Sequence, residues 1–286
     1  MPELPEVQTV VSELQRKIKG KKIKSVAIDA ERVAKPSAAV LCAKLPGTTV
    51  KGVTRRAKLI VIDLGGDHNL LIHLKMTGQL VYVAKSGRRT SGGHPIGDVG
   101  VLPNKFSHVI INFTDGSVLY FNDIRKFGWA KYAGNVERDL EKEKYGVEPF
   151  DKKYTLDYFK SLLKKYPKRK IKQFLLDQTL IAGVGNIYAD ESLFIARIRP
   201  TRLVGSLKEK EIRDLYAAIP KILKFAIGKG GTSADNYVRT DGTKGQMVKY
   251  LKVYGRKGQK CKRCGGTIQK IRLVGRGTHY CPDCQK

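Results

Sequence analysis

The sequence predicts an α+β protein: a β-rich N-terminal half, a helical C-terminal half and a small cysteine module at the end. Three observations support this class. Short strand-like segments run from about residue 22 to 131, amphipathic segments follow residue 154, and four of the five cysteines lie in the last 26 residues. A chain of 286 residues can build two domains with hydrophobic cores. The predicted division is 1–133, a charged linker at 134–153, a helical domain at 154–250 and the cysteine module at 251–286.

The charge of the chain indicates a polyanionic partner. Lys and Arg number 55 against 26 Asp and Glu, which gives a formal net charge of +29. DNA or RNA is therefore favoured over membrane lipid. A lysine-rich proteome would explain a diffuse excess of charge, but it explains clusters such as Lys168-Arg169-Lys170 less well. No apolar run approaches the roughly 18 residues that span a bilayer, and the acidic start does not resemble a signal peptide. We expect a cytoplasmic protein that is not secreted.

Residues 5–19 are expected to form an amphipathic helix, because apolar side chains recur there at helical spacing. If Met1 is removed, Pro2 presents an N-terminal amine, a group with a pKa of roughly 8 that can act as a nucleophile near neutral pH. A structural interpretation competes with this one: the prolines begin the helix, and Glu3 and Glu6 complement its positive end. Taken alone, these first residues favour the structural interpretation.

Eight short strands are expected in the β-rich half, with good turn signals at Gly65-Gly66 and Asp115-Gly116. Consecutive short strands of this kind predict a sandwich or a barrel. The expected strands are 23–29, 50–55, 59–64, 70–75, 79–83, 108–113, 118–122 and 128–132. Residues 84–104, rich in Gly, Ser and Arg, are expected to form a long loop.

Helices are expected in the C-terminal half at 155–166, 170–178, 187–196 and from 206 towards 228. A capping box, Ser206-Leu207-Lys208-Glu209, should open the last of them. Pro220 should kink or split that helix, because proline lacks the N–H group that a helix interior needs. Residues 228–249 are expected to form a flexible loop.

The strongest single motif is a pair of CxxC sequences separated by 16 residues. This spacing fits one structural, tetrahedral Zn²⁺ with four ligands: Cys261, Cys264, Cys281 and Cys284. The module is rich in Lys and Arg, and its expected hairpin presents Arg276 near the tip. Such a basic finger suits nucleic acid, although zinc ribbons also bind proteins. The remaining cysteine, Cys42, is expected to be a small buried side chain.

Two weaker motifs would also suit nucleic acid. Gly183-Val184-Gly185-Asn186, at a predicted helix start, could bind phosphate through backbone N–H groups, with Lys172 upstream. Arg125 and Phe127 lie in a turn between strands and could form a wedge in DNA, although Phe127 could equally be a core residue. Met76, in another turn between strands, would by itself be assigned to the core.

Five motifs, taken in order, resemble the bacterial formamidopyrimidine-DNA glycosylase family, which also contains endonuclease VIII. They are Met1-Pro2-Glu3-Leu4-Pro5-Glu6, Arg125-Lys126-Phe127-Gly128, Gly183-Val184-Gly185-Asn186-Ile187-Tyr188, Val253-Tyr254-Gly255-Arg256 and the four-cysteine module. The resemblance spans essentially the whole chain. It implies an N-terminal β-sandwich, a helix–two-turn–helix domain and a zinc finger, with double-stranded DNA bound between the halves of a monomer.

The resemblance also implies an activity in base excision repair. A damaged purine, such as 8-oxoguanine or a formamidopyrimidine, would be flipped out of the duplex. Pro2 would attack C1′ and form a Schiff base, and β- and δ-elimination would then break the strand. Glu3 matches the general acid, Glu6 a second acidic residue near the site, and Lys58 a lysine that contacts the flanking phosphate.

The resemblance also implies which residues contact DNA. Met76, Arg125 and Phe127 match the residues that fill the vacated space. Asn186 and Arg276 match the pair that grips the kinked backbone, with Lys172 as a further expected contact. Residues 230–250 correspond to a loop over the flipped base.

Two other functions remain open: a glycosylase for oxidised pyrimidines, like endonuclease VIII, and a zinc protein that binds damage without chemistry. Leu4, with Arg125 and Phe127, favours the formamidopyrimidine branch. A protein that only binds damage would not need the complete set of catalytic residues that this sequence has: Pro2, Glu3, Glu6 and Lys58. Three departures from the family pattern bear on the preferred lesion. Ile124 stands where the family usually has proline, and Lys126 stands where it has a second arginine. The base-covering loop reads Gln246-Met247-Val248, where an aromatic residue and a glutamine are commoner.

Overall fold

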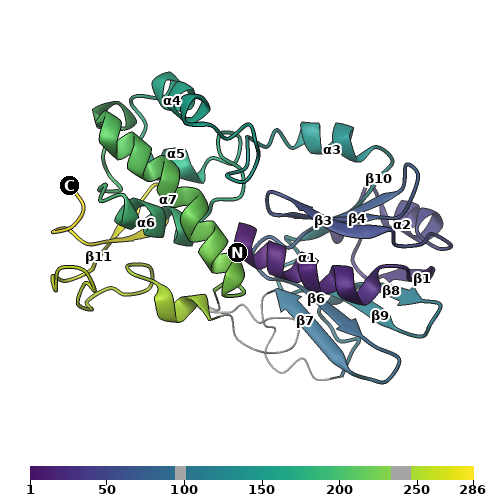
Figure 1. Ribbon diagram of the computed structural model, residues 1–286. Coiled ribbons are helices and arrows are strands. Elements are labelled where there is room, and N and C mark those ends of the chain that lie inside the picture. Colours follow the sequence, from purple (N-terminus) through teal and green to yellow (C-terminus); the bar gives the residue numbers. More distant parts are fainter. Residues whose placement is uncertain (94–100, 233–245) are drawn as a thin grey trace. The chain divides into compact units, whose positions relative to one another are not determined.

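A computed structural model describes residues 1–93, 101–232 and 246–286 (Figure 1). They form two compact units. The first comprises Met1–Glu143 and Lys229–Gln246, and the second comprises Lys144–Gly228 and Met247–Lys286. The predicted α+β class, with an N-terminal β-sandwich, a helical region and a terminal cysteine hairpin, is confirmed. The four-part division at residues 133, 153 and 250 stays a prediction. Among the described helices, none combines the length and apolar character needed to cross a membrane.

Two five-stranded sheets build the first unit, and all eight predicted strands are present. Neighbouring strands are antiparallel except β2 and β10, which are parallel. The order in one sheet is β1 (Ile23–Ile28), β8 (Ser107–Phe113), β9 (Val118–Asp123), β6 (Gly78–Val83) and β7 (Arg89–Gly93). The order in the other is β2 (Ala34–Lys35), β10 (Trp129–Ala133), β5 (Asn69–His73), β4 (Leu59–Asp63) and β3 (Gly52–Arg56).

Strand β4 shows why the second sheet is buried on both faces. Ile60 and Ile62 point into the core shared by the sheets, whereas Leu59 and Val61 point the other way, as the period of two in a strand requires. Side chains of helix α3 (Val136–Lys142) pack against that outer cluster. The segment 134–153, expected to be a linker, therefore contains a helix that covers the sheet.

Helix α1 (Leu4–Ile18) forms where the apolar spacing predicts a helix, and it contacts β3 and β4 of one sheet and β6 and β7 of the other. Figure 1 shows α1 running alongside the strands. Its apolar face is buried in their common core: Val7, Val10, Val11, Leu14 and Ile18. Burial of this face fixes the helix, and with it the residues at its N-terminal end.

Two expectations for the first unit are wrong, and one helix was not predicted. Helix α2 (Ala38–Lys44) was not predicted, and Cys42 on it is exposed rather than buried, because α2 turns Leu41 towards the core. The segment 84–104 is not a plain loop, since β7 extends the first sheet by pairing with β6. Residues 94–100 of that segment lie outside the described residues.

Helices dominate the second unit at the predicted places. They are α4 (Leu156–Lys165), α5 (Ile171–Leu176), α6 (Asn186–Ile195) and α7 (Glu209–Gly228), and a hairpin of β11 (Gln269–Leu273) and β12 (Arg276–Tyr280) follows. Short 3₁₀ turns lie at η2 (Val204–Ser206) and η3 (Met247–Tyr250). Helix α6 contacts α5, α7 and β12, so it joins the helical region to the cysteine hairpin.

Two details of α7 differ from expectation. Pro220 does not split the helix, because buried side chains such as Ile219 and Ile222 hold both sides of it in the core. The predicted capping box is also displaced, since Ser206 belongs to η2. The backbone N–H of Lys208 donates instead to the Glu211 carboxylate at 2.7 Å.

Candidate catalytic, DNA-contact and metal sites

The N-terminal residues are built into the first unit rather than frayed. Pro2 is buried, and Glu3 and Glu6 are 3% and 2% exposed. The Glu3 backbone N–H donates to Glu6 Oε2 at 2.9 Å, which fixes the chain next to Pro2. Because α1 begins at Leu4, this bond also satisfies one of the free N–H groups at a helix start.

The other Glu6 oxygen connects the N-terminus to a distant segment of the same unit. Glu6 Oε1 accepts from the backbone N–H of Thr232 at 2.8 Å and from its hydroxyl at 3.1 Å. Gly231 has φ +76°, and a Cβ placed there would lie 2.9 Å from Glu6 Oε1. Glycine is therefore needed for this close approach. The start of the predicted base-covering loop is thus anchored beside the N-terminus, although residues 233–245 lie outside the described residues.

Lys58 lies in the two-residue turn between β3 and β4 and is 4% exposed. It follows Ala57, whose φ of +52° is uncommon for a residue with a Cβ. Such strained positions cluster at functional sites. Lys58 is therefore a buried lysine in a strained turn, a feature that its sequence does not reveal.

Buried His73, at the end of β5, marks a cationic region around Lys58. Burial is the main cause that lowers the pKa of His73 to about 3, and the charges of Lys75, Lys58 and Lys35 lower it further. The imidazole is therefore neutral at pH 7, and its Nδ1 accepts from the Lys75 backbone N–H at 3.0 Å. Three lysines around one neutral imidazole would favour a phosphate group. Sequence reasoning missed His73, because a single histidine in a strand carries no signal.

Two exposed turns lie at one end of the first sheet. Strands β6 and β9 are paired so that Gly78 lies opposite Asp123, and the turns before β6 and after β9 are therefore neighbours. Met76 is 36% exposed and Phe127 is 41% exposed, so neither is a core residue. The Arg125 guanidinium lies over the Phe127 ring at 4.5 Å, a favourable cation–π distance.

Asn186 is bonded to the residue that follows Arg276 in the second unit. Asn186 is the first residue of α6, and its Nδ2 donates to the Gly277 carbonyl at 3.0 Å, next to exposed Arg276. Its Oδ1 is buried and has no hydrogen-bond partner in the part of the chain that the structure describes. Arg276 follows the two-residue turn Val274-Gly275, which joins β11 to β12.

Lys172 is buried rather than presented to solvent. Its ammonium is 1% exposed and lies 2.7 Å from a carboxylate oxygen of Asp190. It also donates to the Thr278 hydroxyl at 2.8 Å and to the Gly277 carbonyl at 3.1 Å. This arrangement joins α5, α6 and β12, and it does not support the expected contact between Lys172 and phosphate. The sequence shows the charge of a lysine but not its burial.

The adjacent carboxylate, Glu191, holds the start of the finger. It is fully buried and accepts from the backbone N–H groups of Lys252, Val253 and Tyr254 at 2.9–3.1 Å. Burial raises the pKa of Glu191, and these three hydrogen bonds oppose that rise. Sequence reasoning did not select Glu191, because a glutamate in a helix is ordinarily solvated.

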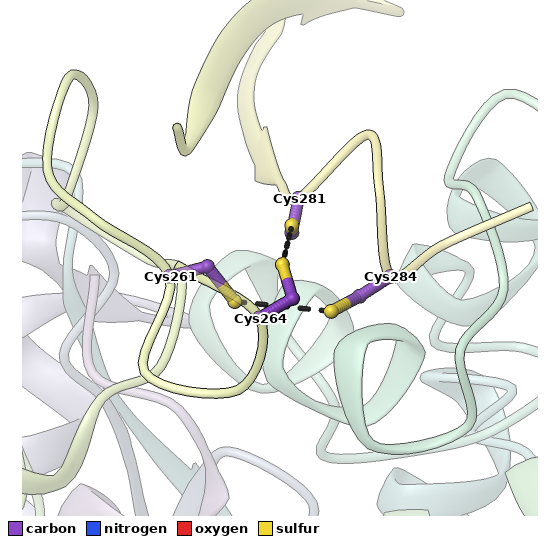
Figure 2. A group of neighbouring side chains, drawn as sticks. All are labelled: Cys261, Cys264, Cys281 and Cys284. Atoms are coloured by element: carbon purple, nitrogen blue, oxygen red, sulfur yellow. Dashed lines mark hydrogen bonds between the residues drawn. The ribbon is translucent and has the colours of Figure 1, made fainter. Parts of the chain in front are cut away.

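The four predicted cysteines converge on one point (Figure 2). Their sulfur atoms all lie within 4.8 Å of one another, with Cys261 to Cys284 at 3.9 Å and Cys264 to Cys281 at 3.5 Å. A tetrahedral zinc site with Zn–S bonds of about 2.3 Å requires S···S distances of roughly 3.8 Å. The sulfur positions therefore fit a four-coordinate metal ion.

The surroundings of Cys261 favour its thiolate, the form that binds metal. Burial raises its pKa, but hydrogen bonds from the backbone N–H groups of Arg263 and Cys264 outweigh that effect and lower the pKa to about 7. The Arg263 N–H lies 3.4 Å from the Cys261 sulfur. Cys261, Cys281 and Cys284 also pack in one hydrophobic cluster with Phe194 of α6, so the four-cysteine site and the helical region share one core.

The fold and these sites define a class of basic, two-unit protein: a β-sandwich with buried residues directly after Met1, joined to helices that carry a four-cysteine finger. Three family models match the chain in this order. The N-terminal domain of formamidopyrimidine-DNA glycosylase matches residues 1–130, and the H2TH domain of the same enzyme matches 145–237. The zinc finger found in FPG and IleRS matches 258–286.

Relatives cover the whole chain. Formamidopyrimidine-DNA glycosylase of Lactococcus lactis subsp. cremoris is 40% identical over 289 residues, which span all of both chains. A solved complex of a Lactococcus lactis Fpg variant with DNA containing Fapy-dG matches with a TM-score of 0.89 at 38% identity. A complex of the wild-type Lactococcus lactis enzyme with DNA containing an oxidised pyrimidine matches at 0.87 and 38%, and both cover all of each chain. The protein belongs to the formamidopyrimidine-DNA glycosylase family.

Proposed function

We propose that this protein is a bifunctional DNA glycosylase and AP lyase that removes oxidised purines, 8-oxoguanine and formamidopyrimidines, from double-stranded DNA. The observation that carries the proposal is the burial of Pro2, Glu3 and Glu6, in which the carboxylate of Glu6 fixes the backbone beside Pro2. A protein that only binds DNA has no need to bury two carboxylates beside its first residues. The complex of the Lactococcus lactis relative with Fapy-dG DNA supports the substrate class.

The proposed reaction begins once Met1 is removed. The secondary amine of Pro2 attacks C1′ of the flipped nucleotide, and the bond from C1′ to the base breaks. Glu3 donates a proton to the sugar-ring oxygen, the ring opens, and an iminium ion joins Pro2 to C1′. Loss of a C2′ proton then expels the 3′ phosphate by β-elimination, and δ-elimination expels the 5′ phosphate. Hydrolysis of the iminium finally releases the proline amine.

The remaining roles are those that the motifs shared with the family imply. Lys58 contacts the phosphate beside the lesion. Met76, Arg125 and Phe127 enter the space left by the flipped nucleotide, and exposed Arg276, with Asn186, holds the distorted backbone. We assign Lys172 a structural role, because its ammonium is paired with Asp190 inside the second unit.

One structural Zn²⁺ is proposed at the four-cysteine site, with all four ligands supplied by the protein: Cys261, Cys264, Cys281 and Cys284. When bound, the ion would hold the hairpin that carries Arg276. We further propose that the protein acts as a cytoplasmic monomer.

Borohydride trapping tests the chemistry directly. Borohydride reduces a Schiff base to a stable amine, so abasic duplex DNA should become attached to the protein. The mass of the trapped N-terminal peptide should equal a peptide that begins at Pro2 plus the sugar remnant. If the mature protein gives no adduct, or if the adduct lies elsewhere, the proposed nucleophile is wrong, and a protein that binds damage without chemistry is favoured.

A glycosylase for oxidised pyrimidines is the second candidate function. The observation that favours it is the solved complex of the Lactococcus lactis relative with DNA containing an oxidised pyrimidine. Single-turnover cleavage of matched duplexes, one with 8-oxoguanine and one with thymine glycol, separates the candidates. Faster cleavage at 8-oxoguanine supports the primary proposal, and faster cleavage at thymine glycol supports the alternative.

A further inference from the structure

The two exposed turns of the first unit meet at one buried carboxylate, that of Asp123 at the end of β9. Asp123 is fully buried. Its Oδ1 accepts from the Arg125 backbone N–H at 3.1 Å, and its Oδ2 accepts from the Gly128 backbone N–H at 2.7 Å. A single carboxylate therefore spans the whole turn that presents Phe127.

The same carboxylate also reaches the other turn. Thr77, which follows Met76, donates its hydroxyl hydrogen bond to Asp123 Oδ1. The Thr77 oxygen in turn lies 3.3 Å from the Arg125 backbone nitrogen. An aspartate that only closed its own turn would account for Arg125 but not for a side-chain bond to a residue 46 positions away.

The backbone around Asp123 is held as firmly as its side chain. Its N–H donates to the Phe106 carbonyl at 2.9 Å, and its carbonyl accepts from His108 Nε2 at 2.9 Å. Gly128, at the end of the turn, leaves no room for a side chain. A Cβ there would lie 2.7 Å from the Phe121 ring and 3.1 Å from Asp123 Oδ2. The backbone hydrogen bonds of Asp123 and the close packing at Gly128 therefore hold the carboxylate in place.

Both turns combine charged residues with uncommon backbone conformations. Arg125 and Lys126 are exposed in the turn, and Lys126 has a φ of +53°, a conformation that non-glycine residues rarely adopt. Lys75, next to Met76, has a φ of +48°. Two turns with strained backbones and exposed apolar side chains need a fixed support to keep one conformation.

We propose that Thr77 and Asp123 are positioning residues that join the Met76 turn and the Arg125–Phe127 turn into one preformed wedge. This inference rests on the proposed function, since it names what holds the residues that enter the DNA. Without the bond between Thr77 and Asp123, the two turns would be joined only at their bases, by the pairing of β6 with β9. Insertion into the duplex would then have to order both turns, and the conformational entropy lost in doing so would oppose insertion.

Thr77→Val tests the inference, because valine keeps the shape of threonine and removes its hydroxyl. The probe is a duplex with 8-oxoguanine and a 2-aminopurine in the opposite strand next to the base that faces the lesion. Its fluorescence rises when insertion unstacks the bases. We expect Thr77→Val to slow both the rise and the base excision by about tenfold, the effect of losing one hydrogen bond to a charged group.

Two matched controls accompany the variant. Thr77→Ser restores a hydroxyl and should recover rates to within about twofold of wild type, because the hydrogen bond is re-formed. Thr48→Val removes a hydroxyl that donates to the Leu45 carbonyl at 2.6 Å in another turn of the same unit, and it should leave both rates unchanged. Loss of activity in Thr48→Val equal to that in Thr77→Val would overturn the proposal.

A second substrate distinguishes a defect in wedge insertion from a defect in catalysis. Abasic DNA with a one-nucleotide gap opposite the abasic site leaves no facing base for the wedge to displace. Thr77→Val should be trapped by borohydride on this substrate as fast as wild type. Equal slowing on gapped and intact DNA would overturn the wedge role. Absence of trapping in the wild-type protein would instead defeat the proposed function.

Amide exchange in the wild-type protein gives a test that needs no variant. The backbone N–H groups of Arg125 and Gly128 should exchange with solvent much more slowly than that of exposed Lys126. If all three exchange at the same fast rate, Asp123 does not hold the turn, and the inference is wrong.

Discussion

At the scale of single residues, buried carboxylates fix the backbone of several segments. Glu6 fixes the backbone at Glu3 and Thr232, Asp123 spans the exposed turn, and Glu191 holds the segment before the finger. Each accepts hydrogen bonds from backbone N–H groups, which compensates for the loss of water around a buried charge. In this strongly basic protein, the few buried acids therefore act as internal anchors.

Pro2→Gly should separate binding from chemistry. Glycine keeps an N-terminal amine but alters its basicity and geometry, so borohydride trapping on abasic DNA should fall by at least about a hundredfold, the lower end of the effect expected for a misplaced reacting group. Affinity for a duplex with a stable abasic analogue should stay within about threefold of wild type, because the phosphate contacts are unchanged. Equal loss of trapping and of affinity would count against Pro2 as the nucleophile.

His73 should make the first unit sensitive to acid. Its pKa is lowered from 6.5 to about 3, mainly by burial. Between these values the unfolded chain binds a proton that the folded protein does not. The His73 contribution to stability is therefore complete above pH 6.5 and is lost as the pH falls towards 3. From pH 7 to pH 5, the free energy of unfolding should fall by about 2 kcal/mol from this group alone.

The measurement is urea unfolding of wild type and His73→Asn at both pH values. Asparagine can still accept the Lys75 N–H but does not titrate, so wild type should lose about 2 kcal/mol more than the variant. His68→Asn, at the other end of β5, serves as the matched control. An identical loss in wild type and His73→Asn would show that His73 does not carry the acid sensitivity.

At the scale of elements, helix α6 connects the helical region to the finger. Its neighbouring residues Asp190 and Glu191 hold two separate segments of the finger. Asp190 accepts from the His279 backbone N–H at 2.8 Å, and Glu191 accepts from the backbone N–H groups of residues 252–254. The Gly183–Asn186 motif begins this same helix. The position of Arg276 is thus set by α6 as well as by the cysteines.

Lys172→Met should destabilise the second unit by about 3 kcal/mol, because it leaves Asp190 buried without its cation. The double variant Lys172→Met/Asp190→Asn removes both charges, and asparagine can still accept from His279, so part of that loss should be recovered. Lys170→Met, at an exposed lysine two residues away, is the control. Thermal unfolding of the four proteins measures the effect. A Lys172→Met protein as stable as the Lys170→Met control would refute the structural role.

At the scale of the whole molecule, the proposed catalytic residues and the four cysteines belong to different units. Pro2, Glu3 and Lys58 lie in the first unit, whereas all four cysteines lie in the second. Each unit has its own hydrophobic core. Damage to the finger should therefore weaken DNA binding without disturbing the N-terminal residues.

Metal removal tests this separation. A chelator should lower the affinity for abasic-analogue DNA by at least about tenfold, since loss of a structural metal unfolds small cysteine modules. Trp129 is the only tryptophan, and it lies in the first unit, so its fluorescence reports that unit alone. The Trp129 emission should not change on chelation. A simultaneous change in Trp129 emission would show that the two units unfold together.

The sequence alone determined the features that depend on local spacing. Short strand-like runs between turn signals predicted the eight strands. Apolar spacing, a glycine-rich entry and a capping signal helped to predict α1 and α4–α7. The CxxC spacing selected the four cysteines that converge in space. These patterns are readable because they depend on residues that are close together in the chain. The resemblance of five motifs then pointed to the family to which the chain belongs.

Only the tertiary structure decided which polar residues are buried and what they hold. Lys172 and Lys170 look alike in sequence, yet one is paired inside the second unit and the other is exposed. Asp123 and Thr77 carry no signal, because their bond joins residues 46 positions apart. Cys42 was expected to be buried and is exposed. Burial and long-range hydrogen bonds arise from the packing of distant segments, and no local pattern encodes them.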